Sequence, residues 1–558
     1  MRYKIEILSL LALLMGVGSA VAQNTNSSYG GVVLNNDIML SSDFATLSNR
    51  GVSGTARSMA MGGAFTSLGG DIASMSINPA GLGMYRSDHF SVTPMVSISS
   101  ASTPSTDDWQ GNNSSNFALG NIGIVLNIYQ GSTKSGKPVS ISIGLGVNRV
   151  ADYNQKYSYS SLSEYNSSAS GELMPTIADV FAQQLGGAGV YPSSNGSLGY
   201  TSTDPYLWPA ILGYNGYMVS DYSDSSGKYW TPDTIGANAS IAHGLMVESS
   251  GSINEYLISM GANISNVIYI GATLGVESVR MDRTITYQEE YLYIDAPASS
   301  SGEQLSSYLD YATISQRSYI KGVGVNFKIG AIIRPFEALR IGIAYHTPTA
   351  YSLERVYQGD IQSKISNSTA SEYNSDSTGQ LYDEGSNSWE FSSPSRLLLG
   401  ASLTLGSRMV VSADYECAWY NSISVNNIPT GTGFVLSDYD KEFSTSYKPT
   451  NTLRAGVEIK PLDNIALRVG GGYTTSMLED DSAFYSSMTP TTSYYVGGGV
   501  GLYLGANTTL DFTYQNHKQN YSSYQLFYSE VSGGELSSGS FETSIRNHNI
   551  VATLGFKF

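Results

Sequence analysis

Apolar and polar residues alternate with a period of two along much of the chain from residue 88 onward. Between Phe90 and Ile98 every second residue is apolar, and most of the residues between them are polar. This pattern is typical of a β-strand with one face in lipid and the other toward a polar interior. About fourteen such segments are expected, an even number as in bacterial outer-membrane barrels. They centre on residues 90–98, 121–128, 139–148, 251–263, 267–285, 315–333, 339–355, 388–405, 409–424, 441–459, 464–476, 491–504, 508–520 and 542–558.

The connections between these segments alternate between short and long. Turns such as 264–266 and 505–507 are short, whereas 160–250, 286–314 and 356–387 are long and polar. In outer-membrane barrels short turns face the periplasm and long loops face outward. The sequence therefore predicts an all-β protein, a transmembrane antiparallel β-barrel of about fourteen strands over residues 88–558.

The last segment alternates up to the final residue, so that Phe556 and Phe558 both point outward. This ending resembles the C-terminal signal that the outer-membrane assembly machinery reads. We therefore expect two partners, the outer-membrane bilayer and that machinery.

The N-terminus has the features of a secretory signal peptide. Arg2 and Lys4 precede an apolar run over 5–17, and small residues at 19–22 supply a cleavage site. We expect a signal peptide at 1–22, a plug at 23–87, and an extended periplasmic lead-in to that plug over 23–54. Past the signal peptide no apolar run is long enough for a transmembrane helix.

The segment from Thr55 to Pro94 is too rich in glycine for a long helix and does not alternate like a strand. Small residues and turn formers allow close backbone packing, which indicates a compact plug. The candidate plug and gate residues are Gly62, Gly63, Asn78, Pro79, Ala80, Gly81 and Leu82.

The run Ala-Arg-Ser-Met-Ala-Met-Gly-Gly-Ala-Phe at 56–65, followed by Asn-Pro-Ala-Gly-Leu at 78–82, resembles the N-terminal hatch of the FadL/TodX outer-membrane transporter family. The resemblance covers roughly forty residues at the level of motifs. It implies a plugged fourteen-stranded barrel in the outer membrane of a Gram-negative bacterium. It also implies transport of long-chain fatty acids and other hydrophobic compounds, with exit sideways through the barrel wall.

Composition fits a barrel and excludes some partners. The chain has 59 Gly, 41 Tyr and 13% charged residues, which suits strands around a polar lumen. A secreted soluble β-protein is the competing interpretation. The net charge of −17 argues against nucleic acid as a partner, and the single Cys417 rules out an intramolecular disulfide.

One long loop has apolar residues at helical spacing between 172 and 185, with aromatic residues after it. The family resemblance implies that such a loop forms a hydrophobic entry groove for a small-molecule ligand. The alternative is that these side chains only make the loop fold on itself. The candidate capture residues are Leu173, Ile177, Val180, Phe181, Leu185 and Trp208.

Several charged residues point into the lumen by strand parity. They could hold a carboxylate headgroup, or they could pair with one another and with Arg57 and Asp71 of the plug. The candidate lumen charges are Lys328, Arg340, Arg454, Arg468, Asp414 and Glu416, with Glu458 and Asp511 on the same face.

Nothing in the sequence indicates catalysis. The five histidines have no metal-ligand spacing and no nucleophile elbow is present, so we expect neither an enzyme, nor a metal site, nor a cofactor. Passive uptake of long-chain fatty acids or similar compounds is the leading hypothesis. The alternatives are a haemin or aromatic-ligand receptor that uses His243, and a non-transporting FadL-like barrel that serves a secretion system.

Overall fold

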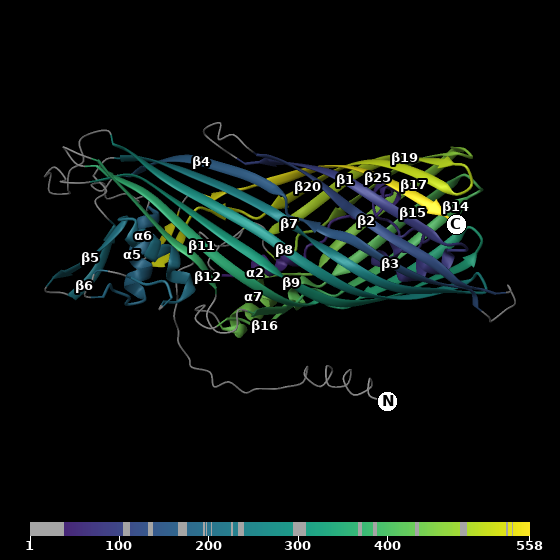
Figure 1. The fold of residues 1–558 in the computed structure, drawn as a ribbon, viewed down its shortest axis with the longest axis horizontal. Helices are drawn as coiled ribbons and strands as arrows, with labels where there is room; N and C mark the ends of the chain where they lie inside the picture. The colour runs from purple at the N-terminus through teal and green to yellow at the C-terminus, as the bar shows by residue number, and fades with distance from the viewer. Residues whose placement is uncertain are drawn as a thin grey trace, which may run out of the picture.

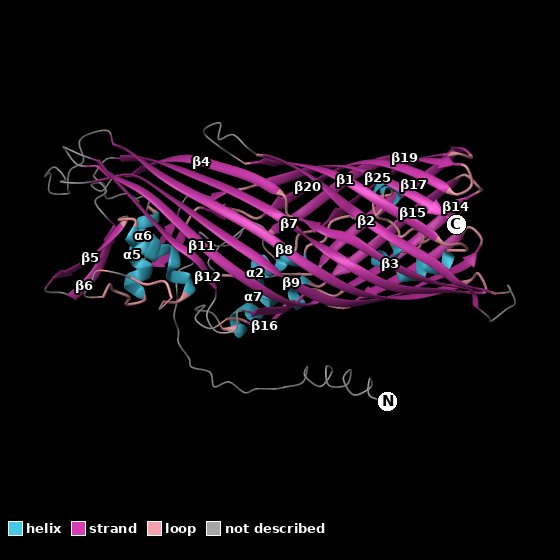
Figure 2. Ribbon diagram, viewed as in Figure 1, coloured by secondary structure: helices cyan, strands magenta, loops and turns pink. Residues whose placement is uncertain are grey.

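The computed structural model describes residues 38–558 apart from 104–111, 132–137, 166–175, 194–195, 197, 202, 225–226, 233–238, 294–307, 367–370, 383–387, 430–434, 480–487, 532–533 and 538–539. It is a tall β-barrel with short helices in its lumen and at one end (Figures 1 and 2). In the described part of the chain, no helix is both long and apolar enough to cross a membrane.

The barrel is a closed ring of fourteen antiparallel strands, which confirms the predicted fold class. The ring closes where His89–Ser102 pairs with Ser544–Lys557. In ring order the strands are β1 (His89–Ser102), β2 (Asn113–Gln130), β3 (Pro138–Asp152), β7 (Ala239–Ile264), β8 (Ile268–Tyr293), β9 (Tyr308–Phe336), β10 (Leu339–His346), β14 (Arg396–Leu405), β15 (Met409–Ala418), β17 (Thr450–Leu462), β18 (Ile465–Thr474), β19 (Pro490–Leu504), β20 (Thr508–Tyr521) and β25 (Ser544–Lys557).

One side of the barrel is much taller than the other. β7, β8 and β9 run unbroken for 26, 26 and 29 residues. Shorter strands continue the wall beside them. The long and the short strands together cover parts of the expected loops 160–250, 286–314 and 356–387. The shorter strands are β4 (Gln155–Tyr165), β11 (Ala350–Ser366), β12 (Ser371–Tyr382), β13 (Ser388–Ser392) and β16 (Ser424–Asn427).

Apolar side chains cover the outside of the ring near its short turns. On β7 and β8 the outward side chains of Ile258, Met260, Ile270 and Leu274 are exposed, whereas polar residues such as Asn263 point inward and are buried. Exposed apolar residues are stable only if lipid covers them, so this band marks the membrane-spanning part of the barrel.

The plug lies inside the ring and touches opposite walls. It contains α2 (Ser41–Ser48), α3 (Ala56–Ala60), α4 (Ser74–Ile77) and the 3-10 helix η2 (Pro79–Met84). α3 contacts β18, β19 and β20, whereas η2 contacts β7, β8 and β9. The structure describes nothing of the expected signal peptide, and the division of the chain at residue 88 stays a prediction.

The expected periplasmic lead-in is wrong for its described part, residues 38–54. Asp43 of α2 forms an ion pair with Arg283, well beyond the point on β8 where Pro79 packs against Gly271. α2 therefore lies in the lumen on the extracellular side of α3 and η2. The reason is its apolar face, because Phe44 is completely buried against Phe391 and Tyr439.

The expected strand over 441–459 begins later than predicted. Residues 436–446 form α7 (Leu436–Ser446), and β17 starts at Thr450. In α7, Tyr439 and Phe443 are four residues apart and fully buried in the cluster that contains Phe44. Packing against α2 thus favours a helix there. A 3-10 helix, η4 (Tyr420–Ser422), lies nearby.

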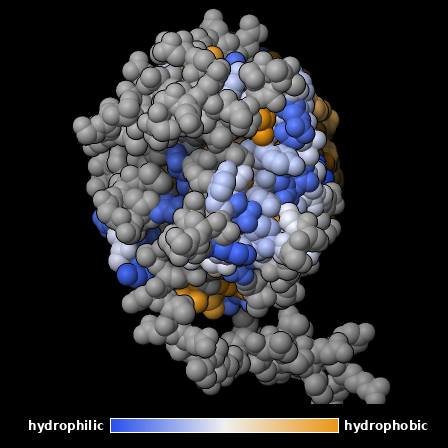
Figure 3. Space-filling view, turned by 90° about the vertical axis from the view of Figure 1, so that its left-hand side faces the viewer, coloured by the Kyte–Doolittle hydropathy of each residue, from blue (hydrophilic) through white to orange (hydrophobic). Residues whose placement is uncertain are grey.

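The extracellular end holds a compact unit that we call the lid, the described residues of 176–232. It contains α5 (Ile177–Gly187), η3 (Pro205–Leu207), α6 (Trp208–Asn215), β5 (Val219–Asp224) and β6 (Gly227–Pro232). Viewed from this end, most of the described surface is hydrophilic (Figure 3). Two small hairpins lie in the last long connection: β21 (Tyr524–Gln525) with β24 (Ser540–Phe541), and β22 (Tyr528–Val531) with β23 (Gly534–Ser537).

Candidate functional site: a polar chamber between plug and wall

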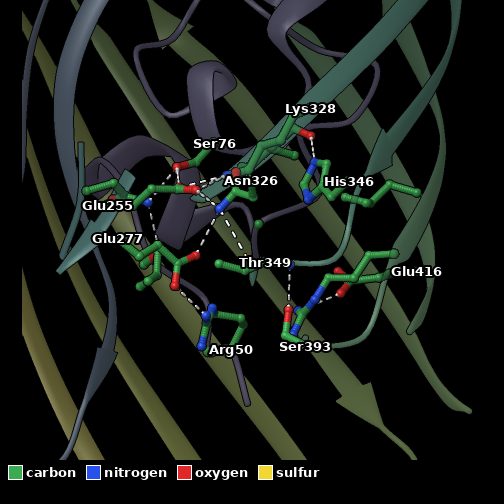
Figure 4. A pocket seen from close by; sticks show the side chains of 18 of the residues that line it. Arg50, Ser76, Glu255, Glu277, Asn326, Lys328, His346, Thr349, Ser393 and Glu416 are labelled. Carbon is green, nitrogen blue, oxygen red and sulfur yellow. Dashed lines mark hydrogen bonds and ion pairs between the residues drawn. The ribbon is translucent and has the colours of Figure 1, made fainter. Parts of the chain in front are cut away.

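A polar chamber of about 120 Å³ lies in the lumen beside the plug (Figure 4). Residues of β7, β8, β9 and β10 line one side, and the plug segment 50–53 lines another. The alternation of the strands explains this lining, because the wall residues in it sit at inward positions. In Figure 4 the side chains of Glu255, Glu277 and Lys328 converge on the same space.

Lys328 and Glu255 form the most buried ion pair of the chamber. Nζ of Lys328 lies 2.6 Å from Oε1 of Glu255, and the two side chains are only 7% and 1% exposed. Asn326 donates a hydrogen bond to the same carboxylate at 3.0 Å, and Ser76 of the plug donates another at 2.9 Å. Donors therefore surround the Glu255 carboxylate, which compensates for its burial.

Arg50 connects the plug to this cluster. Its Nη2 lies 2.7 Å from Oε2 of Glu277, and its Nη1 donates to the carbonyl of Leu47 at 2.7 Å. Burial by itself lowers the pKa of Arg50, but the Glu277 carboxylate and the neighbouring tyrosine hydroxyls together raise it by more, so the net shift is upward. The guanidinium remains charged and holds the C-terminal end of α2 against the wall.

A second cluster of charged side chains contacts the same end of α2 from the other side. Glu416 pairs with Arg454 and, at 3.0 Å, with Arg396. Arg396 also donates to the carbonyl of Ser48 at 2.7 Å, and Tyr420 donates to that carbonyl at 3.2 Å. Two side chains of the wall thus hold the backbone carbonyl of Ser48.

A third cluster holds α3. Arg57 lies 2.9 Å from Glu458, which is also 2.6 Å from Arg468, and Arg468 pairs with Asp511. Asp71, suggested as a partner for the wall charges, instead accepts a hydrogen bond from Thr55 within the plug at 2.9 Å.

The structure places the six predicted lumen charges inside the barrel, in contact with the plug or with a partner of opposite charge. Asp414 accepts a hydrogen bond from the backbone N–H of Thr66 at 2.7 Å, and Arg340 reaches the carbonyl of Leu68 at 3.4 Å. Lys328, Arg454, Arg468 and Glu416 form the ion pairs described above. These six residues therefore mainly contact a partner of opposite charge or the plug. This arrangement is the alternative to binding a carboxylate headgroup.

The predicted gate residues form the contact between plug and wall. Asn78 donates to the carbonyl of Thr66 at 2.6 Å, and its Oδ1 accepts from Ala80 at 3.1 Å, which starts η2 at Pro79. Gly62 has φ +64°, and a Cβ there would lie 2.5 Å from the backbone of Gly471. The remaining plug candidates, Gly63, Ala80, Gly81 and Leu82, are all buried.

The predicted capture residues do not form an exposed groove. Ile177, Val180, Phe181, Leu185 and Trp208 are at most 2% exposed and belong to one apolar cluster. They pack against inward-facing wall residues such as Tyr357, whose ring centre lies 5.3 Å from that of Trp208. The apolar face thus folds into the mouth of the barrel. Leu173 lies outside the described residues, and a role of this loop in capture stays a prediction.

The suggested haem ligand His243 is also buried. Its Nδ1 lies 2.9 Å from the hydroxyl of Tyr287, which donates to Glu289 at 2.6 Å. Glu289 in turn accepts from the first N–H of α5, that of Ile177, at 3.0 Å. This network fastens the lid to β8. No group of side chains that could hold a metal ion occurs among the described residues.

Two further cavities lie between the chamber and the lid. A cavity of about 180 Å³ shares Arg50, Arg396 and Arg454 with the chamber. A cavity of about 40 Å³ shares Tyr153 and Tyr521 with that second one and reaches Ile285 of the lid cluster. The three cavities thus form a series from the lid to the plug.

The wall beside the second cavity has a break between β2 and β3. Their shared ladder runs from Asn121 and Asn148 toward the short-turn end. Beyond Asn148, β3 and then β4 pair with β7, whereas β2 continues along β1. Side chains bridge the break, with Asn116 donating to Asp152 at 3.2 Å. Met95, Ser97 and Gly120 line the second cavity next to it.

A glycine lies in β7 where the partner of that strand changes from β3 to β4. Gly251 in β7 has φ +116°, and a Cβ there would lie 2.2 Å from the carbonyl oxygen of Arg280. Its own carbonyl accepts from the N–H of Tyr153 at 3.0 Å, where β3 ends. This close approach was not predicted, although a lone glycine inside a strand pattern is a known signal for one.

The fold and the lumen define a multi-pass outer-membrane β-barrel with an internal plug. No family model matches the chain, and no curated protein matches its sequence. The solved structures do contain the same fold. A FadL homologue of Pseudomonas aeruginosa is 11% identical, with a TM-score of 0.51, covering 91% of this chain and 99% of its own.

The toluene transporter TodX of Pseudomonas putida is 13% identical, with a TM-score of 0.46, covering 91% of this chain and 99% of its own. At such identities the likeness concerns the fold. The chain therefore has the fold of the FadL/TodX-type barrels that its hatch motif resembles.

Proposed function

We propose that this barrel takes up long-chain fatty acids or similar hydrophobic compounds passively across the outer membrane. In this proposal the ligand is captured at the lid, passes along the lumen cavities and leaves past the plug or through the wall. The main support for the proposal is the series of three cavities between the lid cluster and the chamber beside the plug. The FadL homologue and the toluene transporter TodX share the fold, which supports the same class of substrate.

The lining of the cavities favours an amphiphile over a plain hydrocarbon. Arg50, Arg396 and Arg454 all line both of the larger cavities. These arginines pair with Glu277 and Glu416, and a carboxylate headgroup would share their donors at this part of the path. The apolar chain would pack against the lid cluster, where burial is worth about 0.8 kcal/mol per CH₂ group.

The break between β2 and β3 supports exit sideways into the membrane. It lies beside the second cavity, and Phe117 and Leu119 on its β2 side are exposed on the outer wall. An apolar ligand that left there would enter lipid directly instead of crossing the aqueous periplasm. The plug then acts as the gate, since its residues 50–53 line both the chamber and the second cavity.

The proposal is tested by uptake of radiolabelled oleate in a bacterial host that lacks its own fatty-acid importer. Ser97 lines the second cavity, whereas its neighbour Ile98 faces lipid and is 39% exposed. Ser97→Trp should lower the uptake rate at least about fivefold because it fills the path, and Ile98→Trp should keep it within about twofold. Equal rates in both variants would contradict the proposed path.

A second candidate is a non-transporting barrel that binds a protein partner. The observation in its favour is that the lid fills the mouth of the barrel, where Trp208 and Phe181 are buried against the wall. The same experiment separates the two candidates. If the wild-type barrel is folded in the outer membrane but takes up no more oleate than the empty host, the second candidate is favoured.

A further inference from the structure

A row of polar and cationic side chains crosses the outer wall just beyond the apolar band. Lys518 of β20 lies directly opposite Arg546 of β25 in the ladder. The row continues to Tyr494 on one side and to Ser100 on the other. These residues share the outward parity of Phe512, Tyr514 and Ile550, all exposed on the outer wall.

Two cations in this arrangement destabilise the bare wall. Directly opposite residues in an antiparallel pair have Cβ atoms about 4.5–5.5 Å apart, so like charges repel. Among the described residues, neither Lys518 nor Arg546 takes part in an ion pair. An anion held between the two side chains would relieve the repulsion. Such a pair is unexpected in a chain with a net charge of −17.

The surroundings of the pair show where the anion would come from. Toward the membrane, the next outward positions hold His548 and Asn516, and then Tyr514 with its hydroxyl 2.7 Å from Nδ1 of His548. Aromatic and polar residues of this kind mark the interface of a membrane. Below them Ile550 and Phe512 face lipid. A phosphate bound at Lys518 and Arg546 would therefore lie directly above acyl chains.

We propose that Lys518 and Arg546, with Tyr494 and Ser100 beside them, bind the phosphate of an outer-leaflet phosphorylated glycolipid of the lipid A type. Arg546 supplies paired donors for phosphate oxygens, and Lys518 supplies a second positive charge. The phenol and the hydroxyl can donate further hydrogen bonds. The acyl chains of the same lipid pack on the apolar wall of β1, β20 and β25.

The chain offers a matched control on the other side of the barrel. Arg280 of β8 lies directly opposite Lys321 of β9, also on the outer wall. There Lys321 lies 3.2 Å from Glu354, so its charge has a partner within the protein. Removing Lys321 changes the outer charge as much as removing Lys518 does, without touching the proposed site.

The test is native mass spectrometry of purified full-length barrel titrated with bis-phosphorylated lipid A, with folding checked by heat-modifiable migration. Wild type and Lys321→Ala should bind one lipid A with similar affinity. The double variant Lys518→Ala/Arg546→Ala should bind it roughly thirtyfold more weakly, because each interfacial cation contributes about fivefold. Dephosphorylated lipid A should bind the wild type as weakly as lipid A binds the double variant.

Three outcomes would overturn the proposal. The first is equal binding of lipid A to the double variant and the wild type. The second is equal binding of lipid A and its dephosphorylated form to the wild type. The third is displacement of lipid A by an equal concentration of inorganic phosphate, which would show that the acyl chains contribute nothing and would assign the site to free phosphate.

Discussion

The ammonium group of Lys328 lies 2.6 Å from Oε1 of Glu255 at a point where both side chains are nearly inaccessible. Removing one partner leaves an uncompensated buried charge, which typically costs about 3–5 kcal/mol. We therefore expect Lys328→Met to lower the free energy of unfolding by about that amount, measured by urea unfolding of the barrel in lipid vesicles.

The matching control is the double variant Glu255→Leu/Lys328→Met. Because it removes both charges, it should recover most of the stability that the single variant loses. If the double variant is as unstable as the sum of the two single variants, the two residues do not act as a pair.

The close approach of plug and wall at Gly456 leads to the second prediction. A Cβ at Gly456 would lie 2.3 Å from the carbonyl oxygen of Met61, whereas a Cβ at Gly498 has its nearest contact at 3.4 Å. Gly456→Ala should push the plug backbone off the wall. We expect faster hydrogen exchange of the amides at 56–63 in Gly456→Ala, and wild-type exchange in Gly498→Ala. Identical exchange in both variants would show that the plug does not depend on this contact.

The lid yields the third prediction. Trp208 is 1% exposed and packs on Tyr357, whereas Tyr217 is 53% exposed. Trp208→Ala should cost about 3–5 kcal/mol of local packing and loosen the lid from the mouth. We expect faster protease cleavage within 176–232 while heat-modifiable migration of the barrel is unchanged. Tyr217→Ala serves as the control and should be cleaved like the wild type, and cleavage of Trp208→Ala at the wild-type rate would contradict the packing.

The sequence predicts the ring of strands well because its signal is local. Alternation with a period of two puts Ser140 and Ser142 inside and leaves Ile258 outside, and each strand carries this pattern by itself. The same parity places Lys328 and Arg454 in the lumen. The lengths of the connections, in turn, indicate which end of the barrel faces the periplasm.

The position of the helices could not be read in this way. Neither α2 nor α5 carries a local signal that says which surface its apolar face meets. Phe44 packs on Phe391, and Trp208 packs on Tyr357, across large separations in sequence. For the same reason Arg50, Glu277 and Arg396 were not predicted as chamber residues. Their importance comes from α2 entering the lumen, which the polar composition of 23–54 did not indicate.

Phe558 directly follows the last strand of the ring. Phe558 is 63% exposed at the end of β25, which pairs with both β1 and β20. This geometry fits an outward aromatic at the membrane edge. Its recognition by the assembly machinery stays a prediction.

Whether a hydrophobic ligand occupies the lumen between lid and plug can be decided by identifying what the barrel holds. The barrel would be purified from outer membranes in mild detergent and its bound small molecules released and identified by mass spectrometry. We expect a fatty acid or another long apolar compound in the wild type and in Ile98→Trp, and its loss in Ser97→Trp. A wild-type barrel without such a compound, or equal occupancy in both variants, would contradict this expectation.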